Sequence, residues 1–125
     1  MIRTKIPVMS TFLRVALALQ TLALLIQAIT AGLLLSTPGG RSLHMATAIA
    51  VIVTVLLHLV AAITVRSRAA IMPAVGMVVM TLIQVALGVA HLKAFHVPFG
   101  VLMFGVSTMR LGYAWQGRRA QAATV

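Results

Sequence analysis

Four long apolar stretches divide almost the whole chain, and they constrain its fold more than any other feature of the sequence. Each is about 20 residues long, which is enough to cross the hydrocarbon core of a bilayer as a helix. The expected transmembrane helices cover residues 12–35, 43–65, 69–92 and 97–115. Because the links between them are short, consecutive helices are expected to be antiparallel neighbours. The sequence therefore predicts an all-α integral membrane protein, an antiparallel four-helix bundle that forms a single domain over residues 1–125.

The composition agrees with a membrane environment and excludes much chemistry. Hydrophobic residues make up 62% of the chain, against roughly 45–50% apolar residues in soluble domains. The absence of Cys excludes disulfides, thiolate metal sites and cysteine nucleophiles. The absence of Asp and Glu excludes paired-carboxylate acid–base catalysis and the acidic relays of proton-coupled carriers. These absences disfavour both an enzyme and a transporter.

The basic residues lie at the ends of the apolar stretches. They do not form a patch interleaved with aromatic residues, so a nucleic-acid partner is not expected. One set of helix ends carries most of them, namely Arg3, Lys5, Arg14, Arg66, Arg68, Arg110, Arg118 and Arg119. The other set carries Arg41 and Lys93. The positive-inside rule then predicts a multi-pass protein of the cell (inner) membrane with both termini in the cytoplasm.

The two halves of the sequence resemble each other, as expected for two copies of one helical hairpin. The aligned pairs are Leu25-Ile26-Gln27 with Leu82-Ile83-Gln84, Leu43-His44 with Phe95-His96, and Gly32 with Gly88 after a shift of one residue. Parallel repeats would place the second and fourth helices diagonally opposite each other and in the same direction. Each of these helices would then begin with a histidine at the outer edge of the membrane.

A cation precedes each of these two histidines by three residues, Arg41 before His44 and Lys93 before His96. This spacing places each pair on one helix face or in the turn before it. Haem iron takes axial nitrogen ligands from opposite faces of the ring, and the haem propionates need cationic partners near water. The pattern predicts one haem b near the outer face, ligated by His44 and His96, with Arg41 and Lys93 as propionate partners. The alternative is that the histidines are interfacial polar residues and the cations only set the topology.

Small and polar residues near these positions fit the same interpretation. A macrocycle between helices needs room, which could come from Gly32, Gly88, Gly100, Ala46 and Ala48. Gln27 and Gln84 are polar groups in the middle of the membrane, where they would hydrogen-bond across helices or frame the haem.

His58 and His91 are secondary candidates. His58 follows His44 by fourteen residues, about 21 Å along a helix, but the matching position after His96 is Arg110, which does not ligate iron. A second bis-histidine haem is thereby disfavoured, and His58 is left to hydrogen-bond a neighbouring helix or to contact a quinone. His91 could join His44 and His96 in a three-nitrogen zinc or copper site. The methionines, among them Met45, Met77, Met80 and Met103, could supply copper ligands or fill the core.

Two pairs of segments resemble the four-helix half of the haem A synthase family. They are Gln84–Gly88 with Phe95–Gly100, and Gln27–Gly32 with Leu43–Ala48, within a resemblance that covers roughly residues 12–115. It implies a four-helix bundle in which histidines near the outer ends of the second and fourth helices ligate haem. The family fuses two such halves, and its catalytic half uses a glutamate before the second-helix histidine, whereas this chain is one half and has no Glu.

The resemblance therefore implies a cytochrome-like haem binder, for electron transfer or haem handling, without oxidation of a haem methyl group. Such a protein would sit in the lipid bilayer as a homo-oligomer or with a larger membrane redox complex. The alternative function is a non-catalytic small membrane subunit or anchor, whose positive ends bind a larger complex or anionic lipid.

Overall fold

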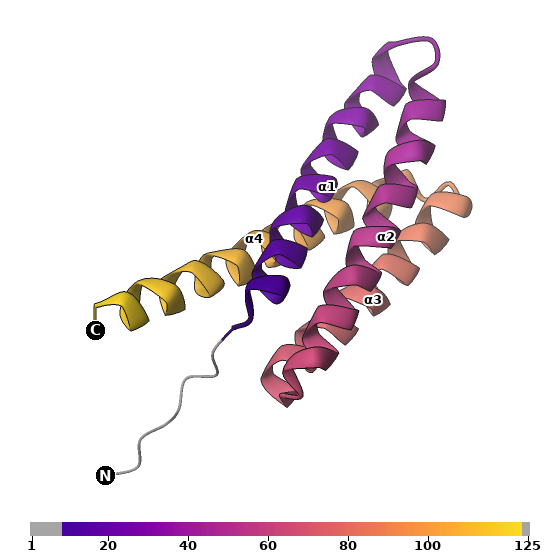
Figure 1. Cartoon of the computed structure of the whole chain (residues 1–125). Helices are drawn as coiled ribbons and strands as arrows, with labels where there is room; N and C mark the ends of the chain where they lie inside the picture. The colour runs from indigo at the N-terminus through magenta and orange to yellow at the C-terminus, as the bar shows by residue number, and fades with distance from the viewer. Residues whose placement is uncertain (1–8, 124–125) are drawn as a thin grey trace.

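The computed structural model describes residues 9–123 as four α-helices with no strands (Figure 1). The helices are α1 (Thr11–Ser36), α2 (Gly40–Val65), α3 (Arg68–Val89) and α4 (Lys93–Ala122). All four are long and apolar enough to cross a membrane. The predictions of an all-α four-helix bundle and of a multi-pass membrane protein are therefore confirmed. Arg3 and Lys5, which contributed to the predicted orientation, lie outside the described residues.

The helices form a ring in chain order. α1 packs against α2 and α4, and α3 packs against the same two helices. Over the described residues, the backbones of the diagonal pairs, α1 with α3 and α2 with α4, do not approach each other closely. The C-terminal half of α4 leaves the bundle beside α1 (Figure 1). We call the end of the bundle where α1 and α3 begin the arginine-rich end, because Arg14, Arg66, Arg68, Arg110, Arg118 and Arg119 lie toward it, and the opposite end the histidine end, because His44, His91 and His96 lie there.

All four helix starts differ from the sequence prediction, those of α1 and α3 by one residue and those of α2 and α4 by more. α2 begins at Gly40 instead of residue 43, directly after Gly39, whose φ of 84° is left-handed. α4 begins at Lys93 instead of residue 97, because the Leu92 carbonyl already accepts bonds from the amides of Phe95 (3.1 Å) and His96 (2.9 Å). Lys93 and His96 therefore belong to the first turn of α4 and not to a link between helices.

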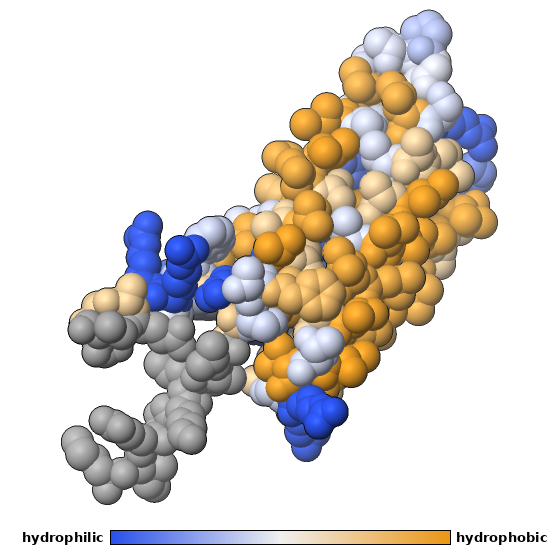
Figure 2. Space-filling model, viewed as in Figure 1, coloured by the Kyte–Doolittle hydropathy of each residue, from blue (hydrophilic) through white to orange (hydrophobic). Residues whose placement is uncertain are grey.

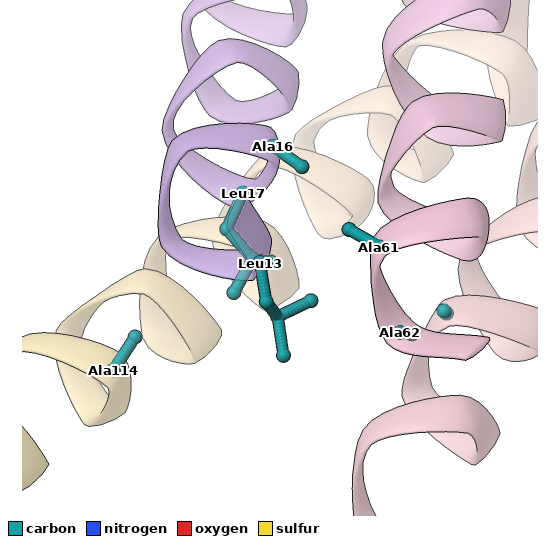
Figure 3. Close-up of a cluster of buried hydrophobic side chains, with 7 residues drawn as sticks. Leu13, Ala16, Leu17, Ala61, Ala62 and Ala114 are labelled. Atoms are coloured by element: carbon teal, nitrogen blue, oxygen red, sulfur yellow. The ribbon is translucent and has the colours of Figure 1, made fainter. Parts of the chain in front are cut away.

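Small residues let the helices approach closely at the arginine-rich end. In Figure 3, Ala16 of α1 and Ala61 of α2 face each other, and Leu13 and Leu17 fill the space beside them. Alanine at a helix contact favours close packing in membranes, where apolar burial itself contributes little. Outside this core, the visible face is mostly hydrophobic, with hydrophilic patches over the C-terminal part of α4, over the α2–α3 turn and at the opposite end of the bundle (Figure 2). This surface suits contact with lipid.

The tight turn between α1 and α2 depends on Gly40. A Cβ there would lie 2.6 Å from the backbone carbon of Leu33 and 2.7 Å from the Cα of Leu34. Because backbone atoms cannot move aside as a side chain can, we expect Gly40→Ala to lower the free energy of unfolding by about 1–3 kcal/mol. Unfolding in detergent would measure this loss. Gly76→Ala is the matched control, since a Cβ at Gly76 has nothing within 4 Å, and equal stability of the two variants would contradict the close turn.

Candidate functional site

The two histidines paired by the sequence meet at the histidine end. His44 lies in the second turn of α2 and His96 in the first turn of α4, and both side chains are partly buried. The centres of their rings are 6.3 Å apart, and the ring planes are inclined by 71°. Because the backbones of α2 and α4 do not approach closely, the two imidazoles lie in the space between diagonally opposed helices.

The orientation of the His96 ring is fixed by α3. Its Nδ1 lies 3.0 Å from the backbone carbonyl oxygen of Gln84. A carbonyl oxygen can only accept, so Nδ1 carries the proton, and in the neutral ring Nε2 has a free lone pair. The amide Nε2 of Gln84 donates to the His96 carbonyl at 2.9 Å and lies 3.4 Å from the ring Nε2. The lone pair of His96 Nε2 therefore faces the amide nitrogen of Gln84.

His44 has the same pattern against α1. Its Nδ1 lies 3.3 Å from the hydroxyl oxygen of Thr30, and its Nε2 lies 3.2 Å from the amide Nε2 of Gln27. The Oε1 of Gln27 accepts from Thr47, which turns the amide nitrogen of Gln27 toward the ring. Because that nitrogen is a donor, the His44 Nε2 is the acceptor. In both histidines, Nδ1 therefore donates to an oxygen of the preceding helix, and Nε2 faces a glutamine amide nitrogen of that helix.

The correspondence between the two halves extends to these contacts. Gln27 and Gln84, aligned in the sequence, each place an amide nitrogen beside the ring Nε2 of the histidine in the following helix. The separations along the chain are 17 residues in the first half and 12 in the second. They differ because α1 continues further beyond Gln27 than α3 does beyond Gln84, and because His44 lies one residue deeper in its helix than His96. The sequence did not indicate Thr30 and Thr47. Their positions, three residues after Gln27 and three after His44, are the signal that could have found them.

Two of the predicted small residues make room for this site, and the others do not. A Cβ on Gly88 would lie 3.1 Å from the Cε1 of His96, and a Cβ on Gly100 would lie 2.9 Å from the amide nitrogen of Gln84. A Cβ on Gly32 would meet nothing within 4 Å. Ala46 is exposed, and Ala48 is partly buried. The space around His96 is thus closely fitted, whereas Gly32 leaves open space in the other half.

One polar side-chain atom beside His96 lacks a hydrogen-bond partner. The Oε1 of Gln84 is buried and has no hydrogen-bond partner among the described residues. Leaving a buried acceptor unpaired costs about 1–3 kcal/mol. The unpaired atom is an acceptor, so only a group that brings a hydrogen-bond donor could satisfy it.

Arg41 and Lys93 lie one helical turn before the two histidines. Both side chains are exposed, and neither has a hydrogen-bond or ion-pair partner within residues 9–123. No Asp or Glu exists in the chain to neutralise them. Both cations are therefore available to an anionic group at this end of the bundle.

His58 has a different role from the paired histidines. Its side chain is only 3% exposed, and its Nδ1 lies 2.8 Å from the Oε1 of Gln20. The amide nitrogen of Gln20 donates to Ser107 at 2.9 Å, and Thr21 and Ser107 share a hydroxyl contact of 2.7 Å. This buried network joins α2, α1 and α4, so His58 hydrogen-bonds a neighbouring helix. Nothing in the described part of the chain supports its predicted contact with a quinone.

The predicted three-nitrogen metal site does not form. Among the described residues there is no group of three potential metal-binding side chains. His91 is exposed and has a left-handed φ of 56°, because it ends α3 in the turn before α4. Of the two roles considered for the methionines, filling the core fits Met77 and Met103, which are buried in an apolar cluster.

Comparisons of the chain with protein-family models, with curated proteins and with solved structures give no match.

Proposed function

We propose that this chain is a cytochrome-like membrane protein that holds one haem b between His44 and His96, for electron transfer or haem handling. The separation of the two rings carries the proposal. A metal–imidazole bond is about 2 Å long, and the ring centre lies about 1 Å beyond the nitrogen, so two imidazoles on one iron have centres about 6 Å apart. The distance between the centres of His44 and His96 is 6.3 Å.

The hydrogen bonds of the two rings support the same role. Metal-ligating histidines usually donate their other ring N–H to a carbonyl or a similar acceptor, which fixes the tautomer and raises the basicity of the ligand. The Nδ1 atoms of His96 and His44 have such acceptors in Gln84 and Thr30. The contacts at the Nε2 atoms, 3.2 and 3.4 Å, are long for hydrogen bonds. Exchanging them for iron would cost little.

The charges of the histidine end support haem in particular. Haem carries two propionates, which bind well to cations near water. Arg41 and Lys93 are exposed one turn from the proposed ligands, and the chain has no carboxylate side chain that could compete for them. Bound haem supplies a one-electron carrier, and its potential depends on the axial ligands and their hydrogen bonds.

The remaining parts of the proposal concern location and assembly. The distribution of basic residues favours the cell membrane with both termini in the cytoplasm, which would put the haem near the outer face. A second copy or a larger membrane redox complex would exchange electrons or haem with it. A non-catalytic anchor subunit is the second candidate, favoured by the C-terminal half of α4, which extends beyond the bundle and ends with exposed Arg118 and Arg119 (Figure 1).

Visible absorption spectroscopy tests the proposal. The protein would be expressed with an adequate haem supply, purified in mild detergent and measured before and after reduction. We expect a sharp α-band and a shifted Soret band on reduction, because ligation by two imidazoles gives low-spin haem. Membranes from the same host without the protein are the control. A colourless preparation that also fails to bind added haemin would overturn the proposal.

A further inference from the structure

The arginine-rich end contains a cavity that the haem proposal does not use. Its volume is about 230 Å³, and residues from all four helices line it. Apolar side chains such as Leu13 and Val65 form part of the wall, together with Tyr113. The cavity lies where α1 and α3 begin, at the far end of the bundle from His44 and His96.

Three arginines line this cavity, and each is held by a neutral partner. Arg14 donates to the hydroxyl of Thr11 at 3.4 Å within its own helix. The guanidinium carbon of Arg118 lies 5.7 Å from the centre of the Trp115 ring, a cation–π distance. Arg110 donates to the backbone carbonyl of Ala69 in α3 at 3.3 Å. These contacts position the guanidinium groups without neutralising them.

The contact of Arg110 follows from a proline in α3. Pro73 has no N–H, so it cannot donate to the carbonyl four residues earlier in its helix, which is that of Ala69. Arg110 donates to this carbonyl instead. The carbonyl left free by Pro73 thus holds Arg110 of α4 against α3 at the wall of the cavity. This bond uses only part of the guanidinium group of Arg110, whose other N–H groups can donate to another acceptor.

No side chain of the protein can balance these charges. The sequence has no Asp or Glu, so none of the three arginines can form an ion pair with a side chain of the chain. Arginine within a membrane span is costly unless it has a partner or reaches water, and α4 is a candidate span that includes Arg110. No side chain of the protein can therefore supply the counter-charge.

We propose that this cavity binds the phosphate group of an anionic phospholipid, with Arg14, Arg110 and Arg118 as its cationic partners. Arginine pairs geometrically with phosphate oxygens, often through two parallel hydrogen bonds. The volume is below the roughly 300–1,000 Å³ of typical small-molecule pockets, so it suits a headgroup whose acyl chains stay in the bilayer. The apolar wall beside the cations matches the junction between a lipid headgroup and its chains.

The single tryptophan of the chain, Trp115, provides a probe beside Arg118. The full chain would be reconstituted into phosphatidylcholine vesicles that contain phosphatidylglycerol, with one or the other lipid brominated on its acyl chains. We expect brominated phosphatidylglycerol to quench Trp115 more strongly, with a relative association constant of about fivefold over phosphatidylcholine. Equal quenching by the two lipids would overturn the proposal.

A competition experiment with inorganic phosphate distinguishes a lipid headgroup from free phosphate as the source of the bound phosphate group. If the site takes a lipid headgroup, millimolar phosphate leaves the quenching by brominated phosphatidylglycerol unchanged. If added phosphate relieves that quenching, the cavity binds phosphate from solution, which overturns the lipid assignment.

Variants that each remove one positive charge distinguish lipid binding in the cavity from general attraction of the protein to an anionic surface. Arg110→Gln and Arg14→Gln should each remove most of the preference for phosphatidylglycerol. Arg68→Gln removes the same charge at the same end but does not line the cavity, so it should keep the preference within about twofold. Arg14→Gln covers the case in which Arg110→Gln does not fold, because the bond of Arg14 lies within its own helix. Equal losses in Arg14→Gln and Arg68→Gln would overturn the proposal.

Discussion

Replacement of either His44 or His96 by alanine is expected to abolish the low-spin haem spectrum. Each ring supplies one of two axial nitrogens, and the other ring, 6.3 Å away across the space between α2 and α4, cannot replace it. We expect haem affinity to fall by more than about 100-fold, beyond the 10–100-fold typical of losing a residue that only supports a ligand. Titration of each purified variant with haemin, followed by absorption, measures the loss.

His91→Asn is the matched control for these two variants. His91 lies at the same end but is exposed in the turn that ends α3, and asparagine tolerates its left-handed backbone conformation. This variant should bind haem with an unchanged spectrum. If the His44 or His96 variant kept the low-spin spectrum, or if only the His91 variant lost it, the assigned ligands would be wrong.

The second large effect is expected for His58→Ala. The imidazole is 3% exposed and contacts Gln20 at 2.8 Å in the network that joins three helices. Its removal leaves a cavity and an unpaired acceptor on Gln20. Since side-chain hydrogen bonds in membranes contribute less than in the core of soluble proteins, we expect a loss of about 2 kcal/mol in the free energy of unfolding, measured in detergent.

Thr108→Ala provides the comparison for His58→Ala. Thr108 is exposed and bonds only within α4, to the Phe104 carbonyl at 2.8 Å. Its replacement should change stability by less than about 0.5 kcal/mol. The folded fraction of the His58 variant should keep the wild-type haem spectrum. Loss of haem from a stably folded His58→Ala protein would show that His58 is a ligand and would contradict its structural role.

The bundle itself could be predicted from the sequence because the length of an apolar stretch determines whether a helix spans a bilayer. The helix starts could not be predicted to the residue. Lys93–His96 appears as a link before Pro98, yet the helix continues through Pro98, which removes only the bond to the carbonyl of Ala94, four residues earlier. Hydropathy does not report such backbone bonding.

Part of the candidate site could likewise be predicted from the sequence, and part could not. The pairing of His44 with His96 followed from the internal repeat, which relates positions that are distant in sequence. The network of His58 could not be predicted, because its partner Gln20 is 38 residues away and Ser107 is 87 residues beyond Gln20. An isolated glutamine in an apolar helix indicates that a polar partner exists and does not indicate which one. The role of Arg110 likewise depends on a carbonyl freed by Pro73, 37 residues before it.

Electron paramagnetic resonance of the ferric, haem-loaded protein tests the central claim most directly. Two axial imidazoles give a low-spin signal, and the 71° between the planes of His44 and His96 predicts the strongly anisotropic form that crossed imidazole planes produce. The His44→Ala and His96→Ala variants should each lose this signal, whereas His91→Asn should keep it. A high-spin signal from the wild-type protein, or a low-spin signal that survives in both alanine variants, would contradict bis-histidine ligation by His44 and His96.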